Sequence, residues 1–261
     1  MRAVVKLGGA LLETEPSRRR MAAELAGVAR DGARLVVVHG GGKQMSRFLA
    51  ERGVSSRFVN GLRVSTPEVL EAVLMVVAGS LNRQLVAALI EAGAMAVGLS
   101  GVDGCLMEAE RFSEELGAVG RPVRANSDLL ELLAHHGYMP VVACVGGDRR
   151  GGIYNVNADQ MAAALAAGFA ADALVFLTDV SGVLDGNGRP LAQLTHGEVR
   201  QLIAQGIATG GMQAKLEAAL GALKAGVRRV FIAPGAEINV VARLLAGEPI
   251  GTRLTAEEAR L

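Results

Sequence analysis

The chain of 261 residues is 51% hydrophobic and 20% charged, and it contains 34 glycines and no tryptophan. This composition is typical of a globular α/β protein and excludes a disordered or fibrous one. The formal net charge of +1 gives no electrostatic reason to expect a nucleic-acid partner, because nucleic-acid-binding domains carry a strongly basic face.

The first predicted strand covers residues 3–7 and runs into Gly8 and Gly9. Glycine lets the backbone approach a phosphate closely, and consecutive N–H groups can then bind its oxygens. The strand also contains Lys6, although lysine is depleted from strands and is costly to bury without a partner. We therefore expect the Lys6 ammonium to face a negative group.

A second strand with the same kind of ending is predicted for residues 35–38, after a helix over residues 18–30. It runs into Gly40, Gly41 and Gly42, which a tight turn would also explain but which we interpret as a phosphoryl-binding loop. Strands joined by one helix lie parallel and adjacent, so both glycine loops should meet at the carboxyl edge of one sheet.

A short helix over residues 44–52 precedes a hairpin over residues 56–65, whose turn is Asn60-Gly61. Residues 67–92 then carry apolar residues at helical spacing, after the typical helix start Thr66-Pro67. A helix this apolar either lies deep in the protein or forms an interface. We expect it to form the contact of a homodimer.

The middle of the chain contains two further predicted strands, residues 94–99 and 139–145, with a helix over residues 127–136 between them. Residues 105–125 lack a helical period and contain glycine and proline, so small hairpins are expected there. An alanine-rich helix then ends near Gly168. We place a boundary between two lobes at this point.

The remaining chain is predicted to form strands over residues 173–177 and 229–232, and helices over residues 199–205 and from Gly210 onward. The last of these helices carries Lys215. Strands and helices that alternate in this way predict a mostly parallel sheet covered by helices on both faces.

The sequence lacks the side-chain patterns that most reaction classes require. Cys105 and Cys144 form neither a metal-binding spacing nor a disulfide framework, which favours a reducing cytoplasm. The four histidines share no helical face, so a metal site is not expected, and no Ser-His-Asp elbow is present. The Gly42-Lys43 pair is followed by Gln44, which does not match a P-loop, and no strand is followed by Gly-x-Gly-x-x-Gly.

Four charged candidates remain: Lys6, Arg63, Asp159 and Lys215. Phosphoryl transfer needs mainly positive charge and N–H donors around the transferred group, which two lysines and two glycine loops would supply. Considered singly, each residue also has a structural explanation. Lys6 could lie at a sheet edge, and Arg63 on the hairpin surface. Asp159 could cap a helix, and Lys215 could be solvated.

Six segments of the chain, taken in order, resemble the motifs of the amino-acid kinase family. They are residues 6–9, 39–42, 60–64, 155–160, 179–184 and 211–215. The resemblance extends to residues 251–254, and six ordered motifs are far more specific than one. It implies an open αβα sandwich with two lobes in one chain. Residues 1–168 would bind an acyl substrate and form the dimer, and residues 169–261 would bind ATP.

The resemblance also implies roles for individual residues. Lys6 and Lys215 stabilise the transferred phosphoryl group, and Asp159 holds both lysines. The catalytic set it implies is Lys6, Lys215, Asp159, Gly9 and Gly41. The substrate-binding set is Gly41, Gly42, Arg63 and Asn155, with the Arg63 fork suited to a carboxylate. The ATP-binding set is Lys6, Gly8, Asp179, Val180, Ser181, Gly182, Val183, Leu184, Ile207, Ala208, Thr209 and Lys215. Mg²⁺ is expected to be held mainly by the nucleotide phosphates, with no protein ligand.

Residues 60–64 are most similar to those of family members that phosphorylate the side-chain carboxylate of N-acetyl-L-glutamate, the second step of arginine biosynthesis. Ser65 stands where threonine is expected, which keeps a hydroxyl group. One alternative is a kinase for aminoadipate or glutamate attached to a carrier protein. Another is a non-catalytic amino-acid-sensing subunit, although a sensor has no use for Lys6, Lys215 and Asp159 together.

The expected partners are therefore N-acetyl-L-glutamate and ATP, in a cytoplasmic homodimer formed through residues 67–92. No membrane partner is expected, because the apolar tract over residues 161–177 is interrupted by Asp172 and the N-terminal apolar stretch ends at Lys6. Arginine-inhibited family members carry a helix ahead of the first strand that links dimers into hexamers. The first strand here is predicted to begin at residue 3, so we expect no strong arginine feedback.

Overall fold

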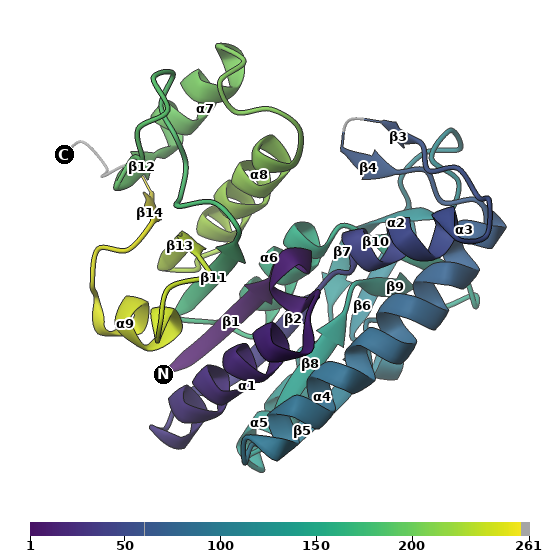
Figure 1. The fold of residues 1–261 in the computed structure, drawn as a ribbon, viewed down its shortest axis with the longest axis horizontal. Helices are drawn as coiled ribbons and strands as arrows, with labels where there is room; N and C mark the ends of the chain where they lie inside the picture. The colour runs from purple at the N-terminus through teal and green to yellow at the C-terminus, as the bar shows by residue number, and fades with distance from the viewer. Residues whose placement is uncertain (60, 257–261) are drawn as a thin grey trace.

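The computed structural model describes residues 1–59 and 61–256, and its centre is an eight-stranded sheet in the order β12-β14-β13-β11-β1-β2-β8-β5 (Figure 1). β1 (Arg2–Leu7) lies inside the sheet, parallel to β2 (Arg34–His39) on one side and to β11 (Ala173–Thr178) on the other. The other strands are β5 (Ala96–Ser100), β8 (Met139–Ala143), β12 (Gln193–Thr195), β13 (Arg229–Pro234) and β14 (Thr252–Thr255). Only the β13–β14 pair is antiparallel within this sheet, which confirms the prediction of a mostly parallel sheet.

Helices cover both faces of the sheet (Figure 1). One face packs on α1 (Glu15–Arg30), α4 (Asn82–Glu91) and α9 (Val240–Ala246). The other packs on α5 (Asp128–His135), α6 (Ala158–Gly168), α7 (His196–Ala204) and α8 (Gly210–Lys224). Successive strand residues contribute to opposite cores, as pleated strands require, so Val36 lies in one core and Val37 in the other. The expected open αβα sandwich is confirmed.

The long apolar helix predicted for residues 67–92 is present. It consists of α3 (Pro67–Ala72), a π-helical segment (Val73–Leu81) and α4. Thr66 caps the start of the helix, because its hydroxyl accepts a hydrogen bond from the Val69 N–H. By length and composition alone, residues Pro67–Glu91 could span a membrane, with a mean hydropathy of 1.7, and 39% of that apolar window is buried within the protein. Buried core helices of soluble proteins have the same composition.

A small closed barrel lies beside the main sheet. Its strands are β6 (Met107–Arg111), β7 (Val119–Ala125), β9 (Val145–Gly147) and β10 (Ile153–Val156). The antiparallel β6–β7 pair confirms the hairpins predicted for residues 105–125. The single strand predicted over residues 139–145 is wrong. The chain leaves the main sheet at Ala143, and the carbonyls of Cys144 and Val145 accept hydrogen bonds from Val156 and Gly101.

The predicted hairpin is present as β3 (Phe58–Val59) and β4 (Leu62–Arg63), which pair antiparallel. Asn60, the first residue of the predicted turn, lies outside the described residues. Gly61 has a φ of +79°, which glycine adopts without strain. A Cβ atom at Gly61 would lie 3.6 Å from the carbonyl carbon of Gly210, so the hairpin tip reaches the start of α8.

Candidate active site

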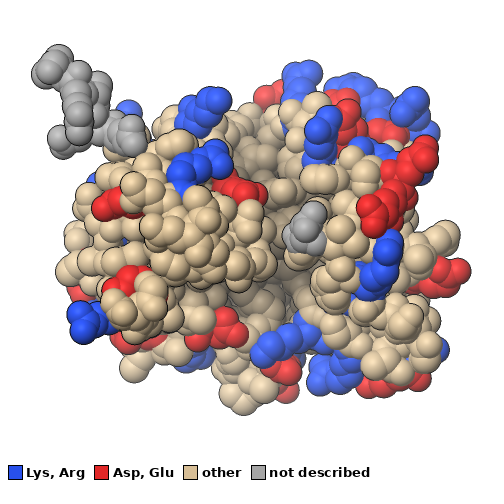
Figure 2. Space-filling model, turned by 90° about the horizontal axis from the view of Figure 1, so that it is seen from above, with Lys and Arg blue, Asp and Glu red and all other residues tan. Residues whose placement is uncertain are grey.

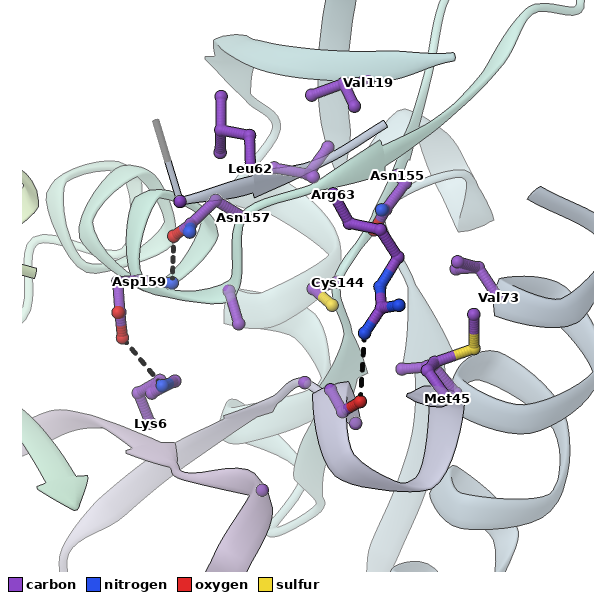
Figure 3. Close-up of a pocket in the computed structure, with 18 of the residues that line it drawn as sticks. Lys6, Met45, Leu62, Arg63, Val73, Val119, Cys144, Asn155, Asn157 and Asp159 are labelled. Atoms are coloured by element: carbon purple, nitrogen blue, oxygen red, sulfur yellow. Dashed lines mark hydrogen bonds and ion pairs between the residues drawn. The ribbon is translucent and has the colours of Figure 1, made fainter. Parts of the chain in front are cut away.

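Lys6 and Asp159 form a buried ion pair at the carboxyl edge of the sheet. Asp159 lies in the first turn of α6, where the Asn157 side chain accepts hydrogen bonds from the N–H groups of Asp159 and Gln160 at 2.9 and 3.2 Å. Asn157 is therefore the cap, and the Asp159 carboxylate is left to contact Lys6. Their Nζ and Oδ1 atoms lie 2.8 Å apart (Figure 3).

Lys215 binds the other oxygen of the same carboxylate. It projects from α8, and its Nζ donates to Asp159 Oδ2 at 2.8 Å. Lys6, Asp159 and Lys215 are 9%, 7% and 7% exposed, respectively. The edge-strand explanation for Lys6, the capping explanation for Asp159 and the solvated-helix explanation for Lys215 are therefore all wrong. One carboxylate holds two ammonium groups that come from opposite ends of the chain.

Burial and the neighbouring charges shift the pKa values of Asp159 and Lys215. Burial opposes the ionisation of Asp159, but the ammonium groups of Lys6 and Lys215 outweigh it and hold the pKa of Asp159 below its ordinary value. Burial and the like charge of Lys6 lower the pKa of Lys215, while Asp159 acts in the opposite direction. With both lysines protonated, the cluster carries a net positive charge, which favours an anionic group beside it.

The two glycine loops lie side by side, as predicted. Gly8 donates its N–H to the Leu177 carbonyl at 3.0 Å, which ties the first loop to β11. Gly9 begins a short 3₁₀ turn, η1 (Gly9–Leu12), and a Cβ atom on it would lie 3.7 Å from the Gly42 nitrogen. Gly42 starts α2 (Gly42–Ala50), two residues earlier than predicted. Backbone N–H groups from both loops can therefore contact one anion.

A pocket of about 220 Å³ connects the lysine cluster with the hairpin. Figure 2 shows the hollow between the two halves of the molecule. Its polar lining comprises Lys6, Asp159, Arg63, Asn155 and Asn157, together with Gly9, Gly40, Gly41 and Gly42. Its apolar lining includes Met45, Leu62, Val73, Val77 and Val119. Figure 3 shows Lys6 and Asp159 on one side of the pocket, and Arg63 and Asn155 on another.

Arg63 is half-buried at this pocket, not simply on the hairpin surface. Its guanidinium donates to the Gly42 carbonyl at 3.1 Å, to Ser46 Oγ at 2.8 Å and to Ser56 Oγ. Within the described residues no carboxylate forms an ion pair with it. The arginine is thus held in place by neutral acceptors, and its positive charge is available to an anionic ligand.

Asn155 is positioned through Ser65. Its Nδ2 donates to Ser65 Oγ at 3.0 Å, and that hydroxyl donates to the Arg63 carbonyl at 3.0 Å. Ser65 is buried, so this contact fixes β10 against the hairpin. Arg63 and Asn155, two of the four residues predicted to bind the acyl substrate, are thus linked by Ser65, whose hydroxyl was noted in the sequence without a role.

Of the predicted ATP set, only Lys6 belongs to the described lining of this pocket. Residues 179–184 follow β11, and residues 207–209 lead into α8. The side chains of Val183 and Ala208 are in the core, so only their backbone could contact a nucleotide. The exposed apolar side chains of these two segments are those of Val180, Leu184 and Ile207.

The comparison with known proteins identifies the family. The model of the amino acid kinase family matches residues 1–234. The chain belongs to the amino acid kinase family. It is 58% identical over 254 residues to the acetylglutamate kinase of Solibacter usitatus, covering 97% of this chain and 99% of the relative. It is 43% identical over 260 residues to the acetylglutamate kinase of Koribacter versatilis, covering 98% and 99%.

A solved structure supports the fold of this chain. The N-acetylglutamate synthase of Neisseria gonorrhoeae, complexed with coenzyme A and N-acetyl-glutamate, matches with a TM-score of 0.88 at 25% identity. The match covers 98% of this chain and 60% of the synthase chain. The synthase thus contains a large part that has no counterpart in the present chain.

The loop over residues 179–184 is anchored by a residue that the sequence analysis missed. Thr252 is fully buried, accepts a hydrogen bond from the Val183 N–H at 2.8 Å and donates to the Leu191 carbonyl at 2.6 Å. A Cβ atom at Gly182, where φ is +149°, would lie only 2.8 Å from the Thr252 hydroxyl oxygen. The resemblance over residues 251–254 was the available signal, but it gave no role.

Among the described residues, no group of three or more His, Cys, Asp or Glu could hold a metal ion. Both oxygens of Asp159 are engaged by Lys6 and Lys215. This donor set fits a magnesium ion that is coordinated by nucleotide phosphates better than one held in a protein cage.

Proposed function

We propose that the chain is an ATP-dependent kinase that phosphorylates the side-chain carboxylate of N-acetyl-L-glutamate in arginine biosynthesis. The observation that carries the proposal is the Asp159 carboxylate, which holds Lys6 and Lys215. Lys6 and Asp159 line the same pocket as Arg63. Phosphoryl transfer needs positive charge beside the transferred group, and N-acetyl-L-glutamate also carries an α-carboxylate that a second cationic group can bind. The names of the close relatives agree with this substrate.

In the proposed reaction, Arg63 binds the α-carboxylate of the substrate, and Asn155 contacts the same molecule. The side-chain carboxylate is ionised at neutral pH, so it attacks the γ-phosphorus without a general base. A bond forms between the carboxylate oxygen and phosphorus, the bond from phosphorus to the bridging oxygen breaks, and ADP leaves. Lys6, Lys215 and the N–H groups of Gly9 and Gly41 stabilise the charge that is spread over the transferred group.

The nucleotide would occupy the side of the site formed by residues 179–184 and 207–209, with Gly8 near its phosphates. Magnesium bound to these phosphates would neutralise part of their charge. We further propose that residues 1–168 form the substrate-binding and dimerisation lobe, that residues 169–261 form the nucleotide lobe, and that the enzyme acts in the cytoplasm.

The homodimer is proposed from the exposed apolar side chains of the long helix. Met75 is 48% exposed and Ile90 is 57% exposed, although both belong to the most apolar helix of the chain. Contact with a second copy of the chain would remove them from water. Sedimentation at micromolar concentration should give the mass of a dimer, and a monomeric mass would contradict the proposal.

The substrate proposal is tested by measuring ADP release with MgATP and a panel of acceptors. N-acetyl-L-glutamate should support turnover, whereas L-glutamate and N-acetyl-L-aspartate, which lacks one methylene, should support little. Activity with glutamate attached to a carrier protein and none with N-acetyl-L-glutamate would favour the carrier-linked kinase. No ADP release with any acceptor would favour the sensing subunit.

Replacing Arg63 with lysine should raise the KM for N-acetyl-L-glutamate and leave the KM for ATP unchanged. Lysine keeps the charge but loses the bidentate fork, and a hydrogen bond to a charged group contributes about 1.5–3 kcal/mol, so the expected rise is about tenfold to 100-fold. The matched control is Arg57→Lys, because Arg57 is exposed in the same region and pairs with Glu115. Equal rises in both variants would contradict the assignment.

A further inference from the structure

A buried histidine and a buried asparagine form a hydrogen-bonded pair directly behind the second glycine loop. His39 ends β2 and Asn82 begins α4, and both are fully buried. His39 Nδ1 lies 2.9 Å from the Gly40 carbonyl oxygen, and its Nε2 lies 2.9 Å from Asn82 Nδ2. Neither side chain belongs to the lining of the pocket.

The orientation of the Asn82 amide fixes the tautomer of His39. Asn82 Nδ2 also donates to the Val141 carbonyl at 3.0 Å, and Asn82 Oδ1 accepts from the Arg83 guanidinium at 2.7 Å. A carbonyl only accepts and a guanidinium only donates, so the amide cannot be reversed. Its second hydrogen therefore goes to His39 Nε2. The imidazole hydrogen then lies on Nδ1 and is donated to the Gly40 carbonyl.

The Gly40 carbonyl in turn determines where the Gly41 N–H points. His39 pairs with Leu7, whose side chain lies in the core on the α1 and α4 face of the sheet. Lys6, one residue earlier on β1, points to the opposite face. No peptide bond in the described chain is cis, so the Gly41 N–H points away from the Gly40 carbonyl, and hence away from His39. It is thus directed toward the face that carries the Lys6 ammonium.

The helix that carries Asn82 also fixes the position of this loop. A Cβ atom at Gly41 would lie only 3.0 Å from side-chain atoms of both Val77 and Leu81, so the loop backbone packs tightly against the helix. Burial lowers the pKa of His39 to about 4, against the opposing effect of its hydrogen bond to Gly40. The imidazole is consequently neutral at physiological pH, as the hydrogen-bond pattern requires.

We propose that His39 and Asn82 are positioning residues for the phosphoryl-binding loop: they hold the Gly40 carbonyl so that the Gly41 N–H is aimed at the transferred phosphoryl group. This inference rests on the kinase function proposed above. Neither residue touches the reacting atoms. The N–H contact strengthens as charge develops in the transition state, so its loss should lower kcat more than it changes either KM.

Two substitutions of His39 separate positioning from stability. In His39→Asn, the side-chain amide lies near the position of Nδ1 and can still donate to the Gly40 carbonyl. In His39→Gln, the amide lies near the position of Nε2, so it keeps the contact with Asn82 and loses the donor to Gly40. Both variants remove the imidazole ring, so each is the control for the other. Their Tm values are compared in thermal unfolding to separate an effect on stability from an effect on kcat.

We expect His39→Gln to lower kcat about tenfold to 100-fold, less than the roughly 100- to 1,000-fold loss caused by removing an oxyanion-hole donor. His39→Asn should retain kcat within about threefold of the wild-type value, and the KM for ATP and for N-acetyl-L-glutamate should change little in both. Equal losses of kcat in the two variants, or losses that follow the change in Tm, would overturn the proposal. Lack of ADP release by the wild-type protein would instead refute the kinase function.

The predicted tautomer of His39 can also be tested on the wild-type protein, so this test does not depend on whether a variant folds. The ¹⁵N NMR shifts of the His39 ring at pH 7 should show a protonated Nδ1 and an unprotonated Nε2. A hydrogen on Nε2 would overturn the proposal whatever the activity of the enzyme, because the Gly40 carbonyl would then have no donor.

Discussion

Lys215→Ala is expected to lower kcat by about 100- to 1,000-fold, comparable with the loss of an oxyanion-hole donor, while the Kd for ATP changes by less than about tenfold. Lys215 is buried and is held by Asp159, so its ammonium is already in place when charge develops on the transferred group. Interactions that are stronger in the transition state than in the ground state affect turnover most. Lys6→Ala should behave in the same way.

The measurement combines steady-state kinetics with a direct titration of nucleotide binding. Lys224→Ala is the matched control, since Lys224 is exposed in the last turn of the same helix. Lys224→Ala should leave both kcat and the Kd for ATP unchanged. If Lys215→Ala weakens nucleotide binding as much as it lowers kcat, the lysine only binds ATP, and its catalytic role is wrong.

Asp159→Asn should lower the free energy of unfolding at pH 7 by about 3–5 kcal/mol, the usual cost of removing one partner from a buried ion pair. The amide has nearly the same shape as the carboxylate but leaves the ammonium groups of Lys6 and Lys215 without a counter-charge. Turnover should also be lost, because Asp159 is the group that holds both lysines.

The stability difference between wild type and Asp159→Asn should depend on pH in a defined direction. The folded-state pKa of Asp159 is below its ordinary value, so the stabilisation is fully present above the unfolded-state pKa of about 3.9 and is lost as the pH falls through the folded-state value. Urea unfolding should give a constant difference between pH 6 and 8 and a smaller one in acid. Asp128→Asn, on the exposed first turn of α5, should cost less than about 1 kcal/mol. A difference that grows in acid would contradict the account.

The features of the fold that follow from local patterns could be predicted from the sequence. The runs of buried residues around Lys6 and before Gly40 predicted two parallel strands with adjacent glycine loops, and β1 and β2 confirm them. The break after Ala143 was not predictable, because it depends on hydrogen bonds with residues distant in the chain, such as the one from Val156 to the Cys144 carbonyl. The short elements β10, β12, β14 and α9 carry too few residues for a periodic signal.

The candidate site could be predicted in its charged residues but not in the contacts that support them. The position of Lys6 inside a predicted strand indicated that its ammonium faces a negative group. The roles of Lys215 and Asp159 could be predicted only from the ordered motifs. The supporting groups Ser65, Asn82 and Thr252 are polar residues whose partners lie on other elements, and spacing along the chain does not reveal such pairs. His39 belonged to the motif over residues 39–42 and was one of the four histidines without a shared face, but no role was predicted for it.

The measurement that tests the central claim most directly is trapping of the reaction product with hydroxylamine. A carboxylate that has accepted a phosphoryl group is an acyl phosphate, which hydroxylamine converts to a hydroxamate. With MgATP, we expect a hydroxamate from N-acetyl-L-glutamate and none from L-glutamate, and its formation should be lost in Lys215→Ala. ADP release from N-acetyl-L-glutamate without a hydroxamate would mean that the phosphoryl group does not go to the carboxylate, and the proposed reaction would be wrong.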